Sequence, residues 1–370
     1  MSARFLTVVL ERAFNMRDGC GREIDYMRIS VIDSCNLNCY YCNPCDNNEH
    51  CHALNILSVK EVLCIVRAAT RLGIKHFRLT GGEPLLHPQL DEMVLQIKKI
   101  PGVSSVSLTT NAVLLAQHAK WLKEAGIDSI NVSLDTIDAS EYERITKKPL
   151  LEEVKHGINA AIECGIRVKI NVVLTPQTDV VALTRYVAKK GTDIRFIEMM
   201  PVGEGHTNGV EPYKKVIGTL SKLYGEPCRI NTEKTKEINS GNDKRKIPDN
   251  GPAEYYIFPE LGIRVGLIQA IHGKFCATCN RIRVTADGRL MPCLGSSVTM
   301  DLVPDSWDFA DDVEKDFAIV RALRAAIKAK PRCHNFNDNA VTYTKTTETK
   351  TTEIEAAEVN AARNMSRIGG

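Results

Sequence analysis

The sequence predicts an α/β protein: a partial (β/α)6, TIM-like barrel followed by a C-terminal extension rich in β-strands. Short apolar runs alternate with longer helical patterns between residues 27 and 199, which is typical of parallel βα units. Beyond Gly203 this rhythm gives way to short alternating runs that favour antiparallel strands. The chain has 370 residues, of which 44% are apolar and 25% charged, so it is long enough to bury one large core with an appendage.

The apolar runs and the amphipathic stretches between them define the barrel elements. The predicted strands cover residues 27–32, 76–80, 103–109, 129–134, 168–174 and 194–199. The predicted helices cover residues 59–72, 90–99, 115–125, 151–164 and 180–190. Several of them end at glycines suited to a helix C-cap, namely Gly73, Gly126, Gly165 and Gly191. Six repeats indicate a barrel or part of one, and catalytic groups then collect at the C-terminal ends of the strands.

The C-terminal part has a different pattern. The runs IRVGLI and RIRVTADGRLM predict antiparallel strands, with a hairpin turn at Asp287-Gly288. A polar stretch at 231–250 is a predicted loop, and residues 316–329 form a predicted amphipathic helix. The Thr/Lys/Glu-rich end has few apolar residues and is expected to be a flexible tail. We therefore divide the chain into a barrel (24–205), an extension (206–335) and a tail (336–370).

Composition narrows the class of protein. A net charge of +3 is too small to indicate a nucleic-acid partner by itself. The longest N-terminal apolar run, residues 5–10, is too short for a signal peptide, and no run approaches the ~20 residues of a membrane span. We expect a cytoplasmic protein with no membrane association. The oligomeric state is left open, and a homodimer is compatible with the sequence.

Two sets of cysteines carry the strongest chemical signal. They are Cys35, Cys39 and Cys42 near the start, and Cys276, Cys279 and Cys293 near the end. Each set offers three thiolates, whereas a closed tetrahedral metal site takes four. An iron–sulfur cluster held by three thiolates leaves one iron free to bind a group that is not protein. The remaining single cysteines are predicted to be small buried side chains: Cys20, Cys64, Cys164, Cys228 and Cys333.

The spacing CxxxCxxC directly after a strand resembles the radical S-adenosylmethionine superfamily, and the loop Gly81-Gly82-Glu83-Pro84 adds to that resemblance. It implies a first [4Fe-4S] cluster on Cys35, Cys39 and Cys42 whose fourth iron binds S-adenosylmethionine. A zinc loop is the alternative, with a fourth ligand from Cys45, His50, Cys51 or His52. The residues that resemble the S-adenosylmethionine site are Tyr41, Gly82, Ser133 and Met200.

The second set lies in FCATCNRIRVTADGRLMPCLG and resembles the GTP 3′,8-cyclase family of molybdenum cofactor biosynthesis. This resemblance implies a second [4Fe-4S] cluster on Cys276, Cys279 and Cys293. It also implies a lyase reaction in which a 5′-deoxyadenosyl radical removes the C3′ hydrogen of GTP and the ribose radical attacks C8. The product would be (8S)-3′,8-cyclo-7,8-dihydroguanosine 5′-triphosphate. An electron donor and a downstream enzyme that takes this nucleotide are implied partners.

The same resemblance assigns residues to the substrate. The expected GTP-site residues are Arg28, Arg78, Thr109, Lys169, Arg281 and Arg283. Arginine suits a triphosphate because its planar fork donates in pairs. The expected catalytic residues are Arg281 and Arg283, with the C-terminal Gly369 and Gly370, which resemble a diglycine tail that enters the active site.

The sequence also departs from the family pattern. Ser34 replaces a usual arginine, His76 a common lysine, and Ala112 a glycine. A neutral imidazole contributes far less to phosphate binding than an ammonium group, so one phosphate contact is in doubt. Two alternatives follow: a diverged radical enzyme with an auxiliary cluster that acts on another nucleotide or a peptide, and a zinc-stabilised binding protein without catalysis.

Overall fold

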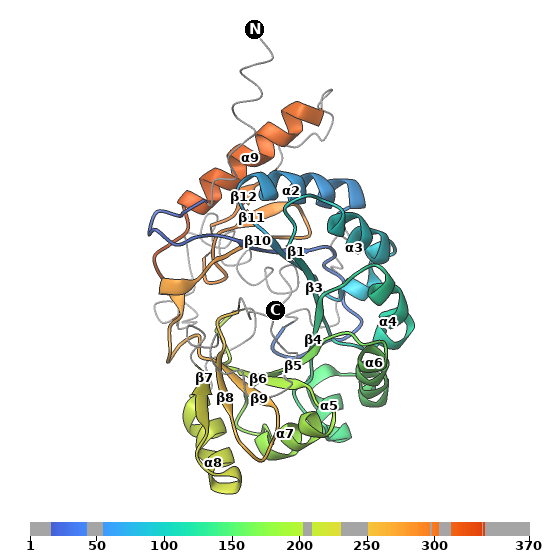
Figure 1. Ribbon diagram of the computed structural model, residues 1–370, viewed down its shortest axis with the longest axis vertical. Coiled ribbons are helices and arrows are strands. Elements are labelled where there is room, and N and C mark those ends of the chain that lie inside the picture. The colour runs from blue at the N-terminus through green and yellow to red at the C-terminus, as the bar shows by residue number, and fades with distance from the viewer. Residues whose placement is uncertain are drawn as a thin grey trace, which may run out of the picture.

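The residues that the structure describes form one twelve-stranded sheet with helices on its outer side. The computed structural model describes residues 16–42, 55–202, 209–230, 251–296, 298–302, 312–334 and 336. The strands follow the order β12-β11-β10-β1-β2-β3-β4-β5-β6-β9-β8-β7. Figure 1 shows that this sheet curves into an arc, so that one face is enclosed and the other carries the helices.

Six parallel strands in chain order make the barrel part of the sheet, as the sequence predicts. They are β1 (Tyr26–Ser30), β2 (His76–Thr80), β3 (Ser105–Thr110), β4 (Ser129–Ser133), β5 (Val168–Val173) and β6 (Asp193–Ile197). Alternate residues of these strands, such as Met27, Ile29, Phe77 and Leu79, are completely buried against the helices. The intervening residues face the inside of the arc, where the polar side chains gather.

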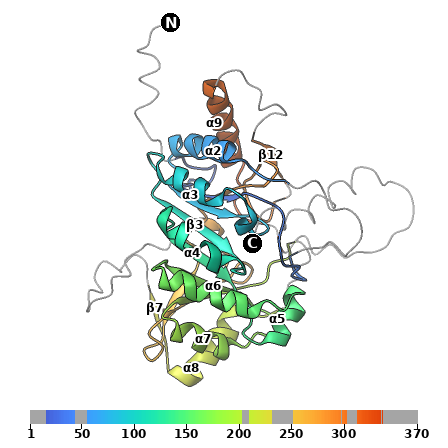
Figure 2. The same ribbon diagram turned by 90° about the vertical axis from the view of Figure 1, so that its right-hand side faces the viewer.

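The helices cover the outer side of the arc, and Figure 2 shows α2, α3, α4 and α6 following one another along it. The helices up to β6 are α2 (Val59–Arg71), α3 (Leu90–Lys98), α4 (Leu115–Glu124), α5 (Ala139–Thr146), α6 (Leu151–Glu163) and α7 (Val180–Lys189). All were predicted except α5, whose eight residues are too few to show a clear helical period. The four predicted C-cap glycines have φ between +64° and +87°, which confirms that role.

The extension adds strands to both edges of the barrel. Its strands are β7 (Cys228–Ile230), β8 (Glu254–Ile257), β9 (Arg264–Ile268), β10 (Arg281–Val284), β11 (Arg289–Met291) and β12 (Met300–Asp301). The predicted antiparallel pairing is confirmed for β8 with β9 and for β10 with β11. The prediction is incomplete, however, because β9 also pairs in parallel with β6, and β10 with β1. Alternating apolarity identifies a strand but does not identify its neighbour.

Because β9 pairs with β6 and β10 pairs with β1, the connection between β9 and β10 runs from one side of the arc to the other. Within the described residues, β9 and β10 do not pair with each other, so strand pairing does not close the barrel there. The crossing connection, residues 269–280, contains Cys276 and Cys279. Chain topology therefore brings the second cysteine set to the open side of the arc.

The C-terminal helix α9 (Asp312–Lys328) begins four residues before its predicted start and packs against α2, where Arg71 pairs with Asp316 at 2.8 Å. Helix α8 (Gly218–Tyr224) lies near α7. None of the helices in the described ranges has the length and apolarity needed to span a bilayer. The predicted loop at 231–250 and the tail after residue 336 lie outside the described residues.

The single cysteines are only partly as predicted. Cys64 is buried and Cys164 is half-buried, but Cys20, Cys228 and Cys333 are exposed, so the prediction of buried thiols is wrong for these three. Each of the three lies in a turn, an edge strand or a loop segment, where a short side chain has little apolar surface to pack against.

Candidate functional site

The first cysteine set lies in the loop that follows β1. The turn is closed by a hydrogen bond from the Cys42 amide to the Cys39 carbonyl at 3.0 Å. Two further backbone bonds fasten this loop to the end of α5: the Asn38 amide donates to Thr146 at 3.0 Å and the Tyr40 amide to Ile145 at 3.1 Å. The unpredicted helix α5 therefore holds the segment that carries the three thiols.

Gly81 and Gly82 bring the end of β2 into direct contact with the cysteine loop. The Gly82 amide donates to the Ile32 carbonyl and the Glu83 amide to the Ser34 carbonyl, both at 2.7 Å. A Cβ on Gly82 would lie 2.1 Å from the Ser34 carbonyl oxygen, and one on Gly81 would lie 2.4 Å from the Ile32 oxygen. The sequence analysis assigned Gly82 to the S-adenosylmethionine site; in the structure the side-chain space of both glycines is filled by the backbone of the cysteine loop. Only glycine permits this approach.

Glu83 was not singled out from the sequence, and it connects three elements of the site. Its carboxylate accepts from Thr110 Oγ1 and from the Asn111 amide, both at 2.7 Å. Asn111 in turn donates to Asn36 Oδ1 at 2.7 Å, and its Nδ2 lies 3.8 Å from Cys35 Sγ. Burial raises the pKa of Glu83 to about 7, although these donors oppose the shift. The carboxyl group thus holds Asn111, and Asn111 orients Cys35.

A small pocket beside the first cysteine set brings together two of the four residues predicted for S-adenosylmethionine. It is lined by Tyr41 and Ser133 together with Leu37, Cys39, Asn111, Asp135, Thr136, Tyr142, Ile145 and Thr146. The Tyr41 hydroxyl donates to Asp135 Oδ2 at 2.5 Å, and Asp135 also accepts from the Val173 amide at 2.7 Å. Burial raises the pKa of Asp135 to about 6. Gly82 and Met200 do not line this pocket; Met200 is half-buried after β6.

The surroundings of the first set of thiols disfavour bare thiolates. Desolvation raises the pKa of Cys35 to about 12 and that of Cys42 to about 11, and it raises the pKa of Cys39 further. Thiols in such surroundings bind as thiolates only when a metal supplies positive charge. In the described ranges, no three His, Cys, Asp or Glu side chains are arranged to hold a metal ion. Cys45, His50, Cys51 and His52 lie outside those ranges, so the zinc alternative is untested.

Four arginines on β1, β2 and β10 share the enclosed face of the sheet. Arg28 on β1 lies between Arg78 on β2 and Arg283 on β10. Two residues earlier on β1, Tyr26 lies opposite Arg281 on β10. The Arg78 guanidinium donates to the Tyr26 hydroxyl and, at 3.4 Å, to Thr109 Oγ1. We call these four residues, Arg28, Arg78, Arg281 and Arg283, the arginine row.

The arginine row places like charges close together in a buried part of the sheet face. Burial, followed by the charge of Arg281, lowers the pKa of Arg283 to about 10. Burial, followed by the charge of Arg283, also lowers the pKa of Arg28. In the described structure, Arg283 Nη1 is buried and has no hydrogen-bond partner. Crowded buried cations with an unused donor are the expected features of a site that binds a polyanion.

The other predicted substrate residues lie further round the same face. Lys169 on β5 is buried and lies opposite Asn131, which itself lies opposite Thr109 on β3. His76, at the position where the family commonly has lysine, makes a 2.8 Å hydrogen bond to Ser105 Oγ, and burial lowers its pKa. His76 therefore brings no fixed positive charge to the arginine row.

The second cysteine set lies next to the arginine row. Cys276 begins a short 3-10 helix (Cys276–Thr278), Cys279 follows it, and Cys293 follows β11. Burial opposes ionisation of Cys279, but the charges of Lys330 and Arg281 outweigh it and lower its pKa. Burial raises the pKa of Cys276, and the neighbouring Cys293 and Cys279 add to this shift. The structure thus brings the three thiols within electrostatic reach of one another and of the row.

The sequence analysis missed two residues: Arg195, which lies on this face, and Glu198, which follows β6. Arg195 on β6 donates from Nε to Asn171 Oδ1 at 2.9 Å, and a Cβ on the opposite Gly266 would lie 2.8 Å from its Cγ. Arg28 was assigned by resemblance to the family, and Arg195 shares with it the physical signal of an arginine inside an apolar strand. Glu198 accepts from the Ile271 and His272 amides at 2.7 and 3.1 Å and so holds the start of the connection that crosses the arc. No sequence pattern indicates this role. Gly369 and Gly370 lie outside the described residues.

Comparison with known proteins shows the family of this chain. Residues 29–182 match the radical SAM superfamily and residues 192–336 match the family described as Molybdenum Cofactor Synthesis C. A GTP 3′,8-cyclase from Clostridium perfringens (strain SM101 / Type A) is 35% identical over 324 residues, which cover 87% of this chain and 95% of that protein. The chain belongs to the GTP 3′,8-cyclase family. Another cyclase of this family, from Peptoclostridium acidaminophilum, is 37% identical over 328 residues, covering 87% of this chain and 94% of that protein.

Solved structures support the fold of this GTP 3′,8-cyclase family member. Streptococcus suis SuiB bound to S-adenosylmethionine matches with a TM-score of 0.53 and 14% identity, over 81% of this chain and 65% of that chain. The α/β fold with a large mixed sheet is therefore that of radical SAM proteins. Membership of this superfamily implies a [4Fe-4S] cluster and S-adenosylmethionine, and the thiols of the first cysteine set are the donor type that such a cluster takes.

Proposed function

We propose that this chain converts GTP to (8S)-3′,8-cyclo-7,8-dihydroguanosine 5′-triphosphate, the first step of molybdenum cofactor biosynthesis. The observation that carries the proposal is the arginine row beside the second cysteine set, on the enclosed face of a radical SAM sheet. The row suits a triphosphate because its like charges repel one another until an anion binds. The high coverage of cyclase relatives supports the same reaction.

Cys35, Cys39 and Cys42 would hold the first cluster, and the pocket containing Tyr41 and Ser133 would receive S-adenosylmethionine. When bound, these groups supply the one-electron chemistry of the superfamily. The protein's own contribution is orientation: Asn111 aims Cys35, and Asp135 fixes the Tyr41 hydroxyl. Gly82 and Met200 are proposed to complete this site from the ends of β2 and β6.

Cys276, Cys279 and Cys293 would hold a second [4Fe-4S] cluster whose free coordination position takes the guanine. Arg28, Arg78, Arg281 and Arg283 would bind the phosphates, with Thr109 and Lys169 further along the same face. Holding both ends of GTP restricts the separation of ribose and base, and such restriction favours an intramolecular ring closure. Arg281 and Arg283 are proposed to take part in catalysis because they join the triphosphate site to the second cysteine set.

The remaining proposals concern organisation. Residues 24–205 are proposed as the radical SAM barrel and residues 206–335 as the extension that closes it around the substrate. Gly369 and Gly370 are proposed to enter the active site from the tail. An electron donor and a downstream enzyme are implied by the chemistry, because the cluster must be reduced and the product is an intermediate.

The test is anaerobic reconstitution with iron and sulfide, followed by incubation with GTP, S-adenosylmethionine and dithionite. The product is detected as a fluorescent pterin after oxidation. Cys35→Ala should lose cleavage of S-adenosylmethionine, whereas Cys276→Ala should retain some cleavage and lose cyclisation. The matched control is Cys228→Ala, which removes an exposed thiol on the edge strand β7 and should retain both activities.

Each failure has a distinct meaning. A preparation that binds only zinc would reject radical chemistry. Normal cleavage of S-adenosylmethionine without pterin would reject cyclase activity and favour a diverged enzyme that acts on another nucleotide or a peptide.

A further inference from the structure

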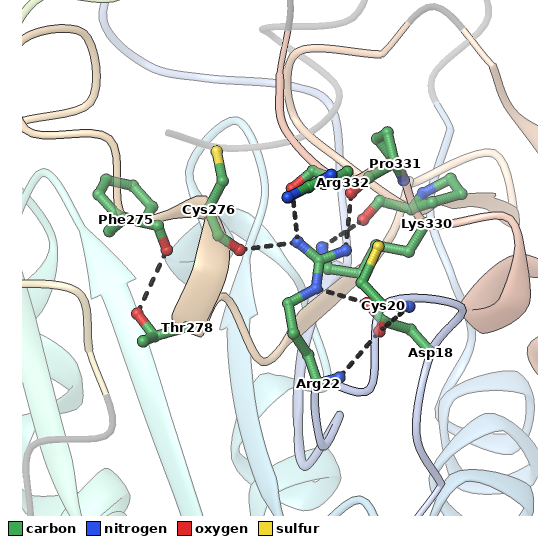
Figure 3. A network of polar contacts seen from close by, with 10 residues as sticks. Asp18, Cys20, Arg22, Phe275, Cys276, Thr278, Lys330, Pro331 and Arg332 are labelled. Atoms are coloured by element: carbon green, nitrogen blue, oxygen red, sulfur yellow. Dashed lines mark hydrogen bonds and ion pairs between the residues drawn. The ribbon is translucent and has the colours of Figure 1, made fainter.

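Arg22, which lies just before β1, joins three distant parts of the chain (Figure 3). Its Nη1 donates to the Cys276 carbonyl at 2.7 Å and to the Arg332 carbonyl at 3.1 Å. Its Nη2 donates to the Pro331 carbonyl at 2.6 Å. On the other side, Nε pairs with Asp18 Oδ2 at 2.6 Å. A single guanidinium therefore fastens the N-terminal segment, the second cysteine loop and the segment after α9.

This contact is built into the interior. Arg22 is 8% exposed and Asp18 is 7% exposed. Asp18 is itself held, because its Oδ1 accepts from the Cys20 and Arg22 amides, both at 2.9 Å. A buried guanidinium is costly unless its donors are satisfied, and here four hydrogen bonds from the fixed fork reach a carboxylate and three carbonyls. Lysine has one point charge and cannot reach all of these acceptors.

The segment that Arg22 fastens also contacts the rest of the second cysteine set. Lys330, which is buried, donates to the Pro292 carbonyl at 2.8 Å, next to Cys293. His334 Nε2 lies 2.8 Å from the carbonyl oxygen of Ala270, near the start of the connection that crosses the arc. Residues 330–334 therefore contact the chain both before Cys276 and beside Cys293, and Arg22 adds the contact at Cys276.

We propose that Arg22 is a positioning residue for the second cysteine set, acting through the carbonyls of Cys276, Pro331 and Arg332. This rests on the proposed function, in which Cys276, Cys279 and Cys293 hold the second cluster. Without the guanidinium, the Cys276 carbonyl and the segment from Lys330 lose their shared anchor, so the three thiols no longer converge. Partners of this kind in the outer shell of a metal site commonly change metal affinity about 10- to 100-fold.

The test uses a parent in which Cys35, Cys39 and Cys42 are all replaced by alanine, so that only the second site can bind iron. Arg22→Gln and Arg22→Lys are made in this parent, and the readouts are iron per chain and the electron paramagnetic resonance signal after reduction. A third readout is alkylation of the thiols in the metal-free protein, with the modified cysteines identified by mass spectrometry. The matched control is Arg71→Gln, which removes another long-range arginine contact to the C-terminal region but touches no cysteine segment.

We expect Arg22→Gln to retain iron about 10- to 100-fold more weakly than its parent and to expose Cys276, Cys279 and Cys293 to faster alkylation, with circular dichroism unchanged. Arg22→Lys should have an iron affinity and alkylation rates between those of the parent and those of Arg22→Gln. It provides the test if Arg22→Gln does not fold. Arg71→Gln should match the parent in all three readouts. Iron binding and alkylation equal to the parent in both Arg22 variants would overturn the inference. A parent that binds no iron would instead reject the second cluster of the proposed function.

Discussion

Replacing Gly82 with alanine tests whether the end of β2 positions the first cysteine loop. A Cβ at this position would lie 2.1 Å from the Ser34 oxygen and 2.5 Å from the Asp33 oxygen, and both are backbone atoms of the loop. The clash must separate the two segments, which threatens the bonds from Gly82 to Ile32 and from Glu83 to Ser34. Overpacking together with two lost hydrogen bonds amounts to about 2–6 kcal/mol.

The assay for Gly82→Ala combines urea unfolding of the metal-free protein with iron content and cleavage of S-adenosylmethionine after reconstitution. We expect either a loss of stability in this range or, if the loop moves to relieve the clash, a smaller loss with poor binding of the first cluster. The control is Gly218→Ala in α8, where no atom lies within 4 Å of the added Cβ and the φ of −60° is helical. It should be neutral or stabilising by about 1 kcal/mol. Wild-type stability together with full cleavage in Gly82→Ala would refute the reasoning.

Three further predictions concern stability. The pKa of Glu83 is about 7 in the fold and about 4.3 when unfolded, so the native state holds the proton to higher pH. Glu83 by itself should therefore lower the unfolding free energy by about 3 kcal/mol from pH 4 to 8. Glu83→Gln should flatten this part of the urea-derived pH profile. Arg283→Gln should leave the melting temperature of the substrate-free protein unchanged or higher, because it relieves repulsion, yet weaken the stabilisation by added GTP. Gly157→Ala should destabilise the fold by about 1–3 kcal/mol in urea, since its Cβ would lie 2.4 Å from the Ala112 carbonyl oxygen.

The outcomes that contradict these three predictions are distinct. Parallel pH profiles for the wild type and Glu83→Gln would mean that the carboxyl group does not titrate in this window. Equal stabilisation by GTP in the wild type and Arg283→Gln would remove Arg283 from the substrate site. An unchanged urea midpoint in Gly157→Ala would mean that α6 can shift away from the Ala112 turn without cost.

Much of the fold could be predicted from the sequence because its signals are local. The six barrel strands alternate with amphipathic helices, and the turn glycines need only their own φ angle to end a helix. Both cysteine sets were found by spacing: the first has three thiols within one short loop, and the second has a CxxC pair followed by a third cysteine within the same short stretch of sequence. Arg28 and Arg78 were found by resemblance to the family, and the cost of a charge inside an apolar strand that meets no opposite charge supported that assignment.

Tertiary structure alone decided which distant segments lie side by side. Local alternation identified β9 and β10, but their parallel pairing with β6 and β1 depends on how the whole sheet is built. That pairing places Arg283 beside Arg28 and so creates the arginine row. Likewise, Gly82 is required by the neighbouring cysteine loop, and Arg22 meets Cys276 and Arg332 across 254 and 310 residues of sequence. Periodicity reports which face of an element is buried, whereas only packing determines what that face is buried against.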